Sequence, residues 1–324
     1  MSNLTSKTLS YFSKILSIAV FCLIFMGALV TSNDAGLAVP DWPNTFGHNM
    51  FLYPPSKWVG GIFYEHVHRL IASGVGLLTL ILTIWILKKE PRKWLRITSL
   101  SALGAVILQG ILGGLTVRYQ LPVAISSFHA VLAQSFLCLT IFIAYALSEE
   151  FLKRKANQAG DKKIFRVGVF ATILIFIQLI FGAVMRHSGA GLAVPDFPTV
   201  AGNWIPDLST NTIETINSFR NSLNLYPISE WHIIIHLLHR YFAFCVIVGV
   251  IYLFISVGKS RYKDSIINKL TGLIFSVVIV QFLLGINVLF TIRSPIPTSL
   301  HVLCGALLLA FSFTLCLFAY PHSE

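Results

Sequence analysis

The sequence contains eight apolar runs, each close to the ~20 residues that an α-helix needs to cross a bilayer. They cover approximately residues 15–33, 62–87, 97–117, 127–147, 167–186, 232–257, 270–291 and 298–319. Only 11% of the residues are charged and the mean hydropathy is +0.76, whereas about a quarter of the residues of a soluble domain are charged. The runs therefore predict an all-α polytopic membrane protein with eight transmembrane helices.

Lysine and arginine are unevenly distributed over the loops that join these runs. Seventeen lie in the loops and the terminal segment on one side of the membrane, and five lie on the other side. Because cytoplasmic loops are enriched in these residues, we expect both termini in the cytoplasm and two long outer loops, 34–61 and 187–231. The same topology accounts for the net charge of +11 without a nucleic-acid partner. The N-terminal segment lacks the Arg-rich amphipathic character of an organelle transit peptide, which favours a bacterial cell (inner) membrane.

One eight-residue segment occurs in both long outer loops. Residues 36–43 read GLAVPDWP and residues 191–198 read GLAVPDFP, which are identical at seven of eight positions. A His-Arg pair follows each copy, and a Gln, a Gly and a His then recur in the same order. This repeat predicts two tandem four-helix bundles, residues 1–150 and 151–324. Because each half holds an even number of spans, an axis along the membrane normal should relate the two halves.

Each half places two histidines near the outer ends of its apolar runs. His68 and His129 lie in the first half, and His239 and His301 lie in the second. An ionisable residue is costly to hold in lipid, so its presence there indicates function. Matched pairs of imidazoles from separate helices suit the iron of a macrocycle in a bundle core. We therefore predict one bis-histidine haem site in each half.

Charged neighbours distinguish the two pairs. Glu65 lies three residues before His68 and on the same helix face, whereas His236 holds that place in the second half. This difference predicts different electrostatics and different jobs for the two sites, although Glu65 could instead stabilise the helix start through the helix dipole. Arg69 and Arg240 could bind haem propionates or extend to the lipid interface, and both alternatives remain open.

None of the other histidines is predicted to bind iron. On a helix, His66 points about 200° away from His68, so we expect it at the polar outer rim. His236 could touch a cofactor, whereas His232 is expected at the membrane interface. His48, His187 and His322 lie in loops or the tail of the expected topology and receive no role.

Taken together, these motifs resemble the haem A synthase family over essentially the whole chain. They are Glu65-x-x-His68-Arg69 in the second span, His129 in the fourth, His239-Arg240 in the sixth and His301 in the eighth. The resemblance implies an oxidoreductase that converts the C8 methyl group of haem O to the formyl group of haem A. It also implies a haem O synthase as supplier and cytochrome oxidase assembly as recipient, while the electron acceptor stays unidentified.

The resemblance also divides the site residues between substrate and cofactor. It implies that His68 and His129 bind the iron of the substrate haem O and that Glu65 belongs to the reaction site. It implies that His239 and His301 bind the iron of a resident haem b.

Two positions relate this chain to branches of the family. Some members carry a cysteine pair in the first outer loop, whereas all five cysteines of this chain lie in apolar runs and none forms a CxxC pair. The chain therefore resembles the cysteine-free (type 2) branch, which is proteobacterial and mitochondrial. Where some relatives have arginine at the end of the first span this chain has Thr31, and Arg186 occupies the equivalent place in the second half.

Two other functions fit the same histidines. One is a bis-histidine dihaem b-type cytochrome that only transfers electrons, and the other is a haem carrier. The cytochrome would hold two permanent haems and need no special carboxylate, and the carrier would hold exchangeable haem and leave it unchanged.

Overall fold

The structure is a computed structural model that describes residues 2–204 and 208–322. Within these ranges it contains helices and no β-strand, and eight of the helices are long and apolar enough to cross a membrane. The eight are α1 (Ser2–Ser32), α2 (Gly61–Lys89), α3 (Lys93–Arg118), α4 (Val123–Ala146), α6 (Lys162–His187), α8 (Glu230–Lys259), α9 (Ser265–Phe290) and α10 (Pro295–Ala319). This confirms the expected all-α polytopic membrane protein.

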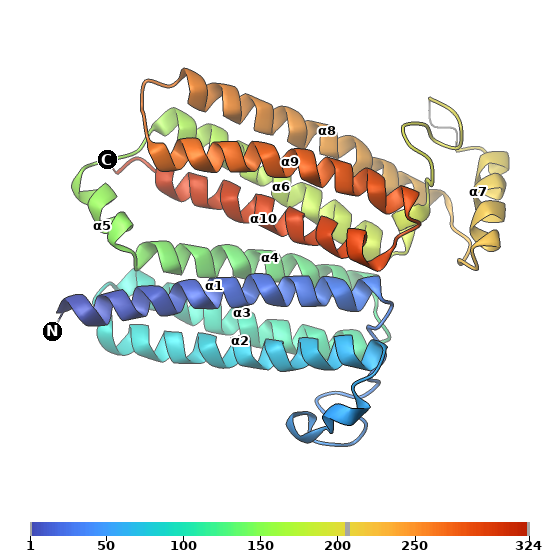
Figure 1. The fold of residues 1–324 in the computed structure, drawn as a ribbon, viewed down its shortest axis with the longest axis horizontal. Helices are drawn as coiled ribbons and strands as arrows, with labels where there is room; N and C mark the ends of the chain where they lie inside the picture. The colour runs from blue at the N-terminus through green and yellow to red at the C-terminus, as the bar shows by residue number, and fades with distance from the viewer. Residues whose placement is uncertain (1, 205–207, 323–324) are drawn as a thin grey trace.

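Two shorter helices lie in the connections. The first, α5 (Glu149–Ala156), begins where the Ser148 side chain accepts a hydrogen bond from the backbone N–H of Phe151. The second, α7 (Thr210–Ser222), belongs to the second outer loop and stands beyond the ends of the long helices (Figure 1). Neither was predicted from the sequence, because both are short and polar.

The long helices pack in two groups (Figure 1). Helices α1 to α4 enclose one apolar core, and α6, α8, α9 and α10 enclose another. The groups meet where α1 and α4 pack against α10 and where α4 packs against α6. The boundary predicted between residues 150 and 151 falls inside α5, and the division into two domains stays a prediction.

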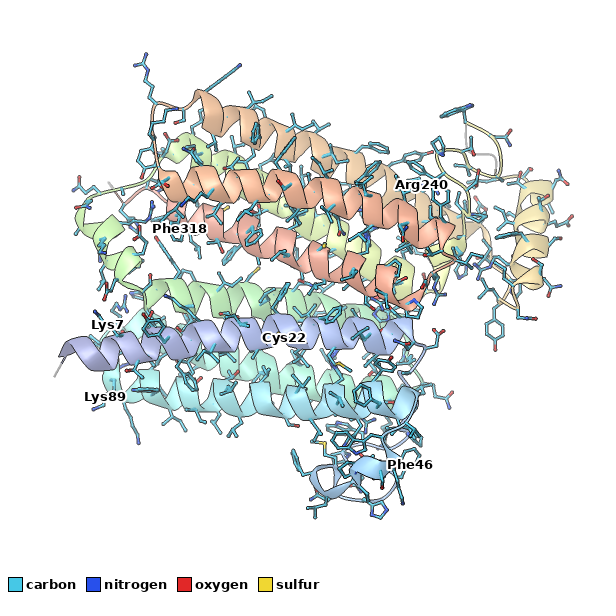
Figure 2. The ribbon with its side chains drawn as sticks, in the orientation of Figure 1. Lys7, Cys22, Phe46, Lys89, Arg240 and Phe318 are labelled. Atoms are coloured by element: carbon cyan, nitrogen blue, oxygen red, sulfur yellow. The ribbon has the colours of Figure 1, made fainter. Side chains whose placement is uncertain are left out.

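The two ends of the bundle differ in character. Lys7 and Lys89 lie at the end that holds both termini, and Phe46 and Arg240 lie at the opposite end (Figure 2). That opposite end carries the two long loops and the short 3₁₀ helices Met50–Leu52, Pro55–Lys57 and Ala190–Leu192. The two loops predicted to be external thus lie at the same end of the bundle, one next to the histidine-bearing end of α2 and the other next to that of α8 (Figure 1).

Candidate functional site

The first histidine pair lines a large cavity between helices. His68 on α2 and His129 on α4 both border a cavity of about 550 Å³, within the usual ~300–1,000 Å³ range of small-molecule and cofactor sites. Each imidazole packs against a glycine of a neighbouring helix. A Cβ atom on Gly27 would lie 3.1 Å from His68 Cε1, and one on Gly113 would lie 3.4 Å from His129 Cε1. These glycines let the helices approach the rings closely.

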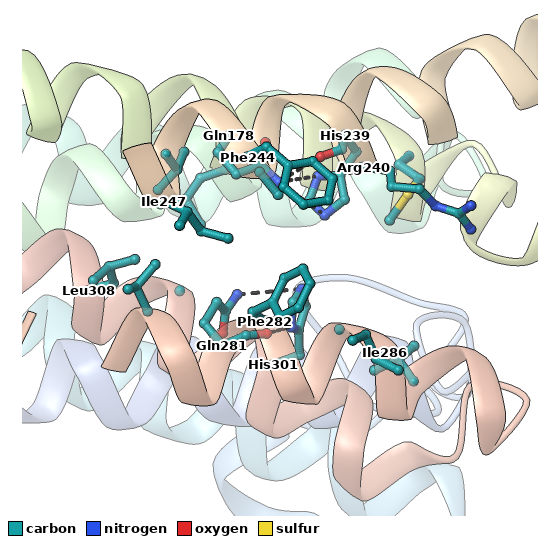
Figure 3. Close-up of a pocket in the computed structure, with 18 of the residues that line it drawn as sticks. Gln178, His239, Arg240, Phe244, Ile247, Gln281, Phe282, Ile286, His301 and Leu308 are labelled. Atoms are coloured by element: carbon teal, nitrogen blue, oxygen red, sulfur yellow. Dashed lines mark hydrogen bonds between the residues drawn. The ribbon is translucent and has the colours of Figure 1, made fainter. Parts of the chain in front are cut away.

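The second pair has the same arrangement in a narrower space. His239 on α8 and His301 on α10 face each other with ring centroids 6.3 Å apart, and both line a cavity of about 150 Å³ (Figure 3). A Cβ atom on Gly182 would lie 3.0 Å from His239 Cε1, and one on Gly285 would lie 3.2 Å from His301 Cε1. Each of the four histidines is therefore packed against a glycine.

Glutamine side chains accompany the second pair (Figure 3). His301 Nδ1 lies 3.1 Å from the backbone carbonyl oxygen of Gln281, so its N–H donates there and Nε2 is the unprotonated nitrogen. The side-chain amide nitrogen of Gln281 lies 3.4 Å from this Nε2, so an iron bound there would replace the amide contact. Gln178 donates to the backbone carbonyl oxygen of His239 at 2.9 Å, and its amide nitrogen lies 3.2 Å from His239 Nδ1. These contacts orient both rings.

The first pair is held more loosely. The Nδ1 atoms of His68 and His129 are buried and have no hydrogen-bond partner among the described residues. The larger cavity also extends beyond the first half, since α6 residues from Phe176 to His187 line it, and it reaches His239 and His301. The two histidine pairs therefore border one continuous space.

Glu65 lies beside the first pair in a fully occupied hydrogen-bond network. The residue is 4% exposed and lines the larger cavity. Its Oε2 accepts from the backbone N–H of Val39 at 2.7 Å, and its Oε1 accepts from Arg69 Nη2 at 2.5 Å. Glu65 therefore connects α2 to the first outer loop, and it does not cap the helix, which begins at Gly61.

Arg69 and Arg240 bind the outer loops in the same way. Arg69 donates to the carbonyl oxygens of Val39, Asp41 and Asn44, at 2.7 to 3.0 Å. Arg240 donates to those of Val194, Asp196 and Thr199, at 2.7 to 3.3 Å. The Arg240 guanidinium points away from the space between His239 and His301 (Figure 3). Both arginines thus fasten a loop over a cavity, and their contact with haem propionates stays a prediction.

Each fastened loop is closed by an aspartate. Asp41 accepts from the backbone N–H groups of Phe46 and Gly47 at 2.8 Å, and Asp196 accepts from the equivalent groups of Ala201 and Gly202. Burial on its own raises the pKa of Asp41, but these N–H groups bring the pKa below its usual value. Asp41 is therefore ionised at neutral pH and keeps the loop closed.

Aromatic residues of the repeated segment reach the cavities. Trp42 borders the larger cavity and packs on Gly114, where a Cβ atom would lie 2.5 Å from the indole ring. Phe197 borders the smaller cavity and contacts Phe282 edge-to-face, with ring centroids 6.1 Å apart. The two loops thus form the outer walls of the two cavities.

His236 replaces Glu65 in the second half. It is 4% exposed, and its Nδ1 lies 3.0 Å from the carbonyl oxygen of Ala190, to which it donates. Arg240 Nη2 lies 3.3 Å from its Nε2, which accepts. A neutral imidazole therefore makes the connection between loop and arginine that the Glu65 carboxylate makes in the first half.

The expectation that His66 lies at the outer rim is wrong. His66 is fully buried, with its Nδ1 3.2 Å from Thr45 Oγ1 and the rings of Tyr53 and Trp58 packed against it. The first outer loop folds over this face of α2 and covers it, which helical periodicity alone does not reveal.

Four residues near the histidines were not singled out as site residues by sequence reasoning. Gln178, Arg186, His187 and Arg293 all line the larger cavity. His187 belongs to the last turn of α6 and not to a loop. Three of the four come from α6, and the approach of this helix to the first half could not be read from hydropathy. Among the described residues, no group of three or more His, Cys, Asp or Glu side chains is placed to hold a metal ion.

Comparison with known proteins gives a consistent family match. The model of the family COX15-CtaA, described as cytochrome oxidase assembly protein, matches residues 10–313. A heme A synthase of Shouchella clausii is 27% identical over 314 residues, which cover 95% of each chain. A heme A synthase of Shewanella oneidensis is 25% identical over 98% of each chain, and one of Paracoccus denitrificans is 29% identical over 81% of this chain and 67% of its own.

Proposed function

The chain belongs to the COX15-CtaA family of cytochrome oxidase assembly proteins, and on that premise we propose that it oxidises the C8 methyl group of haem O to the formyl group of haem A. It is a multi-pass membrane protein and an oxidoreductase of haem biosynthesis, as its similarity to heme A synthases along nearly its whole length supports. Its product serves the assembly of cytochrome oxidase.

The first half is proposed as the substrate side. His68 and His129 bind the iron of haem O in the larger cavity. The observation that carries this assignment is the contrast between the halves. The Nδ1 atoms of His68 and His129 have no hydrogen-bond partner among the described residues, which suits a ligand that must enter and leave. The rings of His239 and His301 are oriented by Gln178 and Gln281, which suits a permanent one.

The second half is proposed as the site of a resident haem b. His239 and His301 would hold its iron, with Gln178 and Gln281 fixing the rings. The fit rests on the paired donors, on the hydrogen bond from His301 Nδ1 to Gln281 that leaves Nε2 unprotonated, and on the glycine beside each ring. When bound, this haem supplies a relay for electrons removed from the substrate. The space that both histidine pairs border supports this proposal, because a relay there would lie close to its electron donor.

Glu65 is proposed as the catalytic residue of the first half. It lines the substrate cavity, and its carboxylate stabilises positive charge at the C8 methyl carbon or accepts a proton as oxygen is added. Arg69 and Arg240 are proposed to act at the cofactor edges of the two sites, where they hold the loops that carry Trp42 and Phe197.

Further proposals concern the cellular setting. With its five cysteines all in transmembrane helices, the chain is assigned to the branch without the outer-loop pair. We place it in a bacterial cell membrane with both termini cytoplasmic, because the lysine-rich loops lie at the end that holds the termini. A haem O synthase is its proposed supplier.

Co-expression tests the function directly. The full-length protein is produced with a haem O synthase in a host that lacks haem A, and the extracted haems are separated and identified by mass. We expect haem A from the wild type and from the exposed-loop control His48→Ala, and none from His68→Ala or His129→Ala. Unconverted haem O together with two stably bound haem B molecules would instead establish an electron-transfer cytochrome.

A further inference from the structure

The lining of the larger cavity is positively charged. Among its charged side chains are Arg69, Arg186 and Arg293, opposed by Glu65 as the one carboxylate of the described lining. A cluster of cations facing an apolar space inside a membrane protein is costly unless an anion accompanies it. The question is which of the three arginines is available to a bound anion.

Arg69 is already committed to the protein. Its two terminal nitrogens donate to three loop carbonyl oxygens and to the carboxylate of Glu65. Its charge is balanced by Glu65 in a pair whose side chains are 9% and 5% exposed. Arg69 therefore has little capacity left for a ligand.

Arg293 is partly committed as well. Its Nη2 lies 3.5 Å from Oδ1 of Asp34, whose side chain is 85% exposed. Because exposed pairs are weak, Arg293 can exchange this contact for another anion, but it does not lack a partner.

Arg186 has no such partner. It lies in the last turn of α6 in the second half and reaches across the interface to α1. There its Nη2 donates to the carbonyl oxygen of Ala28 at 2.7 Å and to Ser32 Oγ at 2.9 Å. Among the described residues, no carboxylate lies within ion-pair distance of Arg186, and its Nη1 and Nε donate no hydrogen bond. The side chain points between the two bundles, so it does not simply extend to the lipid interface.

The repeat shows what is missing from the first half. The residue equivalent to Arg186 is Thr31, which also lines the larger cavity and donates its hydroxyl to the carbonyl oxygen of Gly27. The first half thus has no cation of its own at this position. Arg186, which lines this cavity, supplies one from the second half and is anchored by Nη2.

We infer that Arg186 binds a propionate carboxylate of the substrate haem in the first-half cavity, so that the second half contributes directly to the substrate site. The inference rests on the proposed function, because it takes that cavity as the place of haem O. Both bidentate edges of a guanidinium include Nη2, and Nη2 of Arg186 is engaged by Ala28 and Ser32. A propionate would therefore accept a single charge-assisted hydrogen bond from Nε or Nη1. Arg293 is placed to assist at the same outer end.

Haem B and its dimethyl ester provide the test, because they differ only in whether the propionates carry charge. Each is titrated into the purified full-length protein and followed by Soret absorbance. The difference between wild type and His68→Ala isolates binding at the first-half cavity. The variants are Arg186→Gln and Arg186→Lys, with Arg118→Gln at the outer end of α3 as the control, because Arg118 does not line the cavity. The spectrum of the resident haem in the second half reports correct folding.

We expect the wild type and Arg118→Gln to bind the free acid about 10- to 100-fold more tightly than the ester, the usual range for a hydrogen bond to a charged group. Arg186→Gln should lose this preference and keep its affinity for the ester, and Arg186→Lys should keep part of it. If Arg186→Gln still preferred the free acid as strongly as the wild type does, the inference would be overturned. It would also be overturned if this variant lost affinity equally for the free acid and the ester. Either result would leave the proposed substrate site standing. Identical titrations of wild type and His68→Ala would overturn the proposed substrate site and the inference with it.

Discussion

The carboxylate of Glu65 and the guanidinium of Arg69 form an ion pair one helical turn apart on α2, with 2.5 Å between Oε1 and Nη2. Both side chains are buried beneath the first outer loop, whose Val39 is bonded by both of them. The proposed catalytic group is therefore also a structural connection, and its two roles have to be separated by experiment.

Glu65→Gln separates them. Glutamine keeps an oxygen to accept from Val39 N–H but loses the negative charge that balances Arg69. Because Arg69 still donates to three loop carbonyl oxygens, the loop should stay in place while charge stabilisation and proton transfer are lost. We expect haem A formation to fall by about 10²- to 10⁴-fold, the usual contribution of a general acid or base. Haem A is quantified per bound haem, with Glu230→Gln at the start of α8 as control. Unchanged haem A formation at normal haem content would remove Glu65 from the reaction.

The glycine behind His301 offers a second prediction. In Gly285→Ala the new Cβ atom would lie 3.2 Å from His301 Cε1, so the ring has to shift by a few tenths of an ångström. Gly272→Ala on the same helix meets nothing within 4 Å and serves as the control. We expect Gly285→Ala alone to change the absorption and paramagnetic resonance spectra of the resident haem, although alanine is the better helix former at both positions. Identical spectra for the two variants would argue against iron ligation by His301.

Haem retention should differ between the halves. We expect purified His301→Ala to lose the resident haem b, because the hydrogen-bonded ligand is removed from a preformed site. His129→Ala should retain it, since it alters the site from which haem exchanges. Haem content per protein, measured as the pyridine haemochrome, tests this. If both variants lost haem b equally, the proposed division into a substrate site in the first half and a resident haem site in the second would be wrong.

At the opposite end of the molecule, Asp264 pairs with Arg154, with 2.5 Å between Oδ2 and Nη2. Burial raises the pKa of Asp264, but backbone N–H groups and Arg154 bring the pKa below its ordinary value. A carboxyl with a lowered folded-state pKa adds stability above its unfolded pKa of about 3.9 and loses it as the pH falls through the folded pKa. Asp264→Asn should therefore cost about 1–3 kcal/mol of unfolding free energy at neutral pH.

Thermal unfolding in detergent at several pH values measures this cost. The difference between wild type and Asp264→Asn should be constant from about pH 5 to 8 and shrink below about pH 4. Asp161→Asn is the matched control, because Asp161 caps α6 as Asp264 caps α9 but forms no recorded ion pair with an arginine in the described chain. If the stability difference between wild type and Asp264→Asn grew as the pH fell, the lowered pKa of Asp264 would be contradicted.

Hydropathy located the transmembrane helices closely, because each long apolar run can satisfy its backbone in a membrane only as a helix. The first run was expected from residue 15, whereas its apolar helix extends back to Lys7. Polar residues in the first turns of a helix lower local hydropathy without ending the helix. The short α5 and α7 were missed for the same reason.

The sequence could pair the histidines, because the repeat matched His68 with His239 and His129 with His301. It could not reveal that Arg69 binds three loop carbonyls, since backbone acceptors carry no sequence signal. Nor could it bring Arg186 to the first half, because periodicity describes the faces of a helix and not the docking of two bundles. Contacts that cross between repeats are visible only in three dimensions.

The larger cavity has walls from both repeats, and this limits how the halves can be exchanged. A chimera with the second half of a distant relative would replace the wall formed by residues 176–187 together with Arg293 and Thr298. The imported iron ligands could be intact and the substrate pocket still misshapen. Although the chain repeats a four-helix unit, residues of both repeats line the larger cavity. A substitution in one half that reshapes this cavity therefore has to be matched by substitutions in the other half.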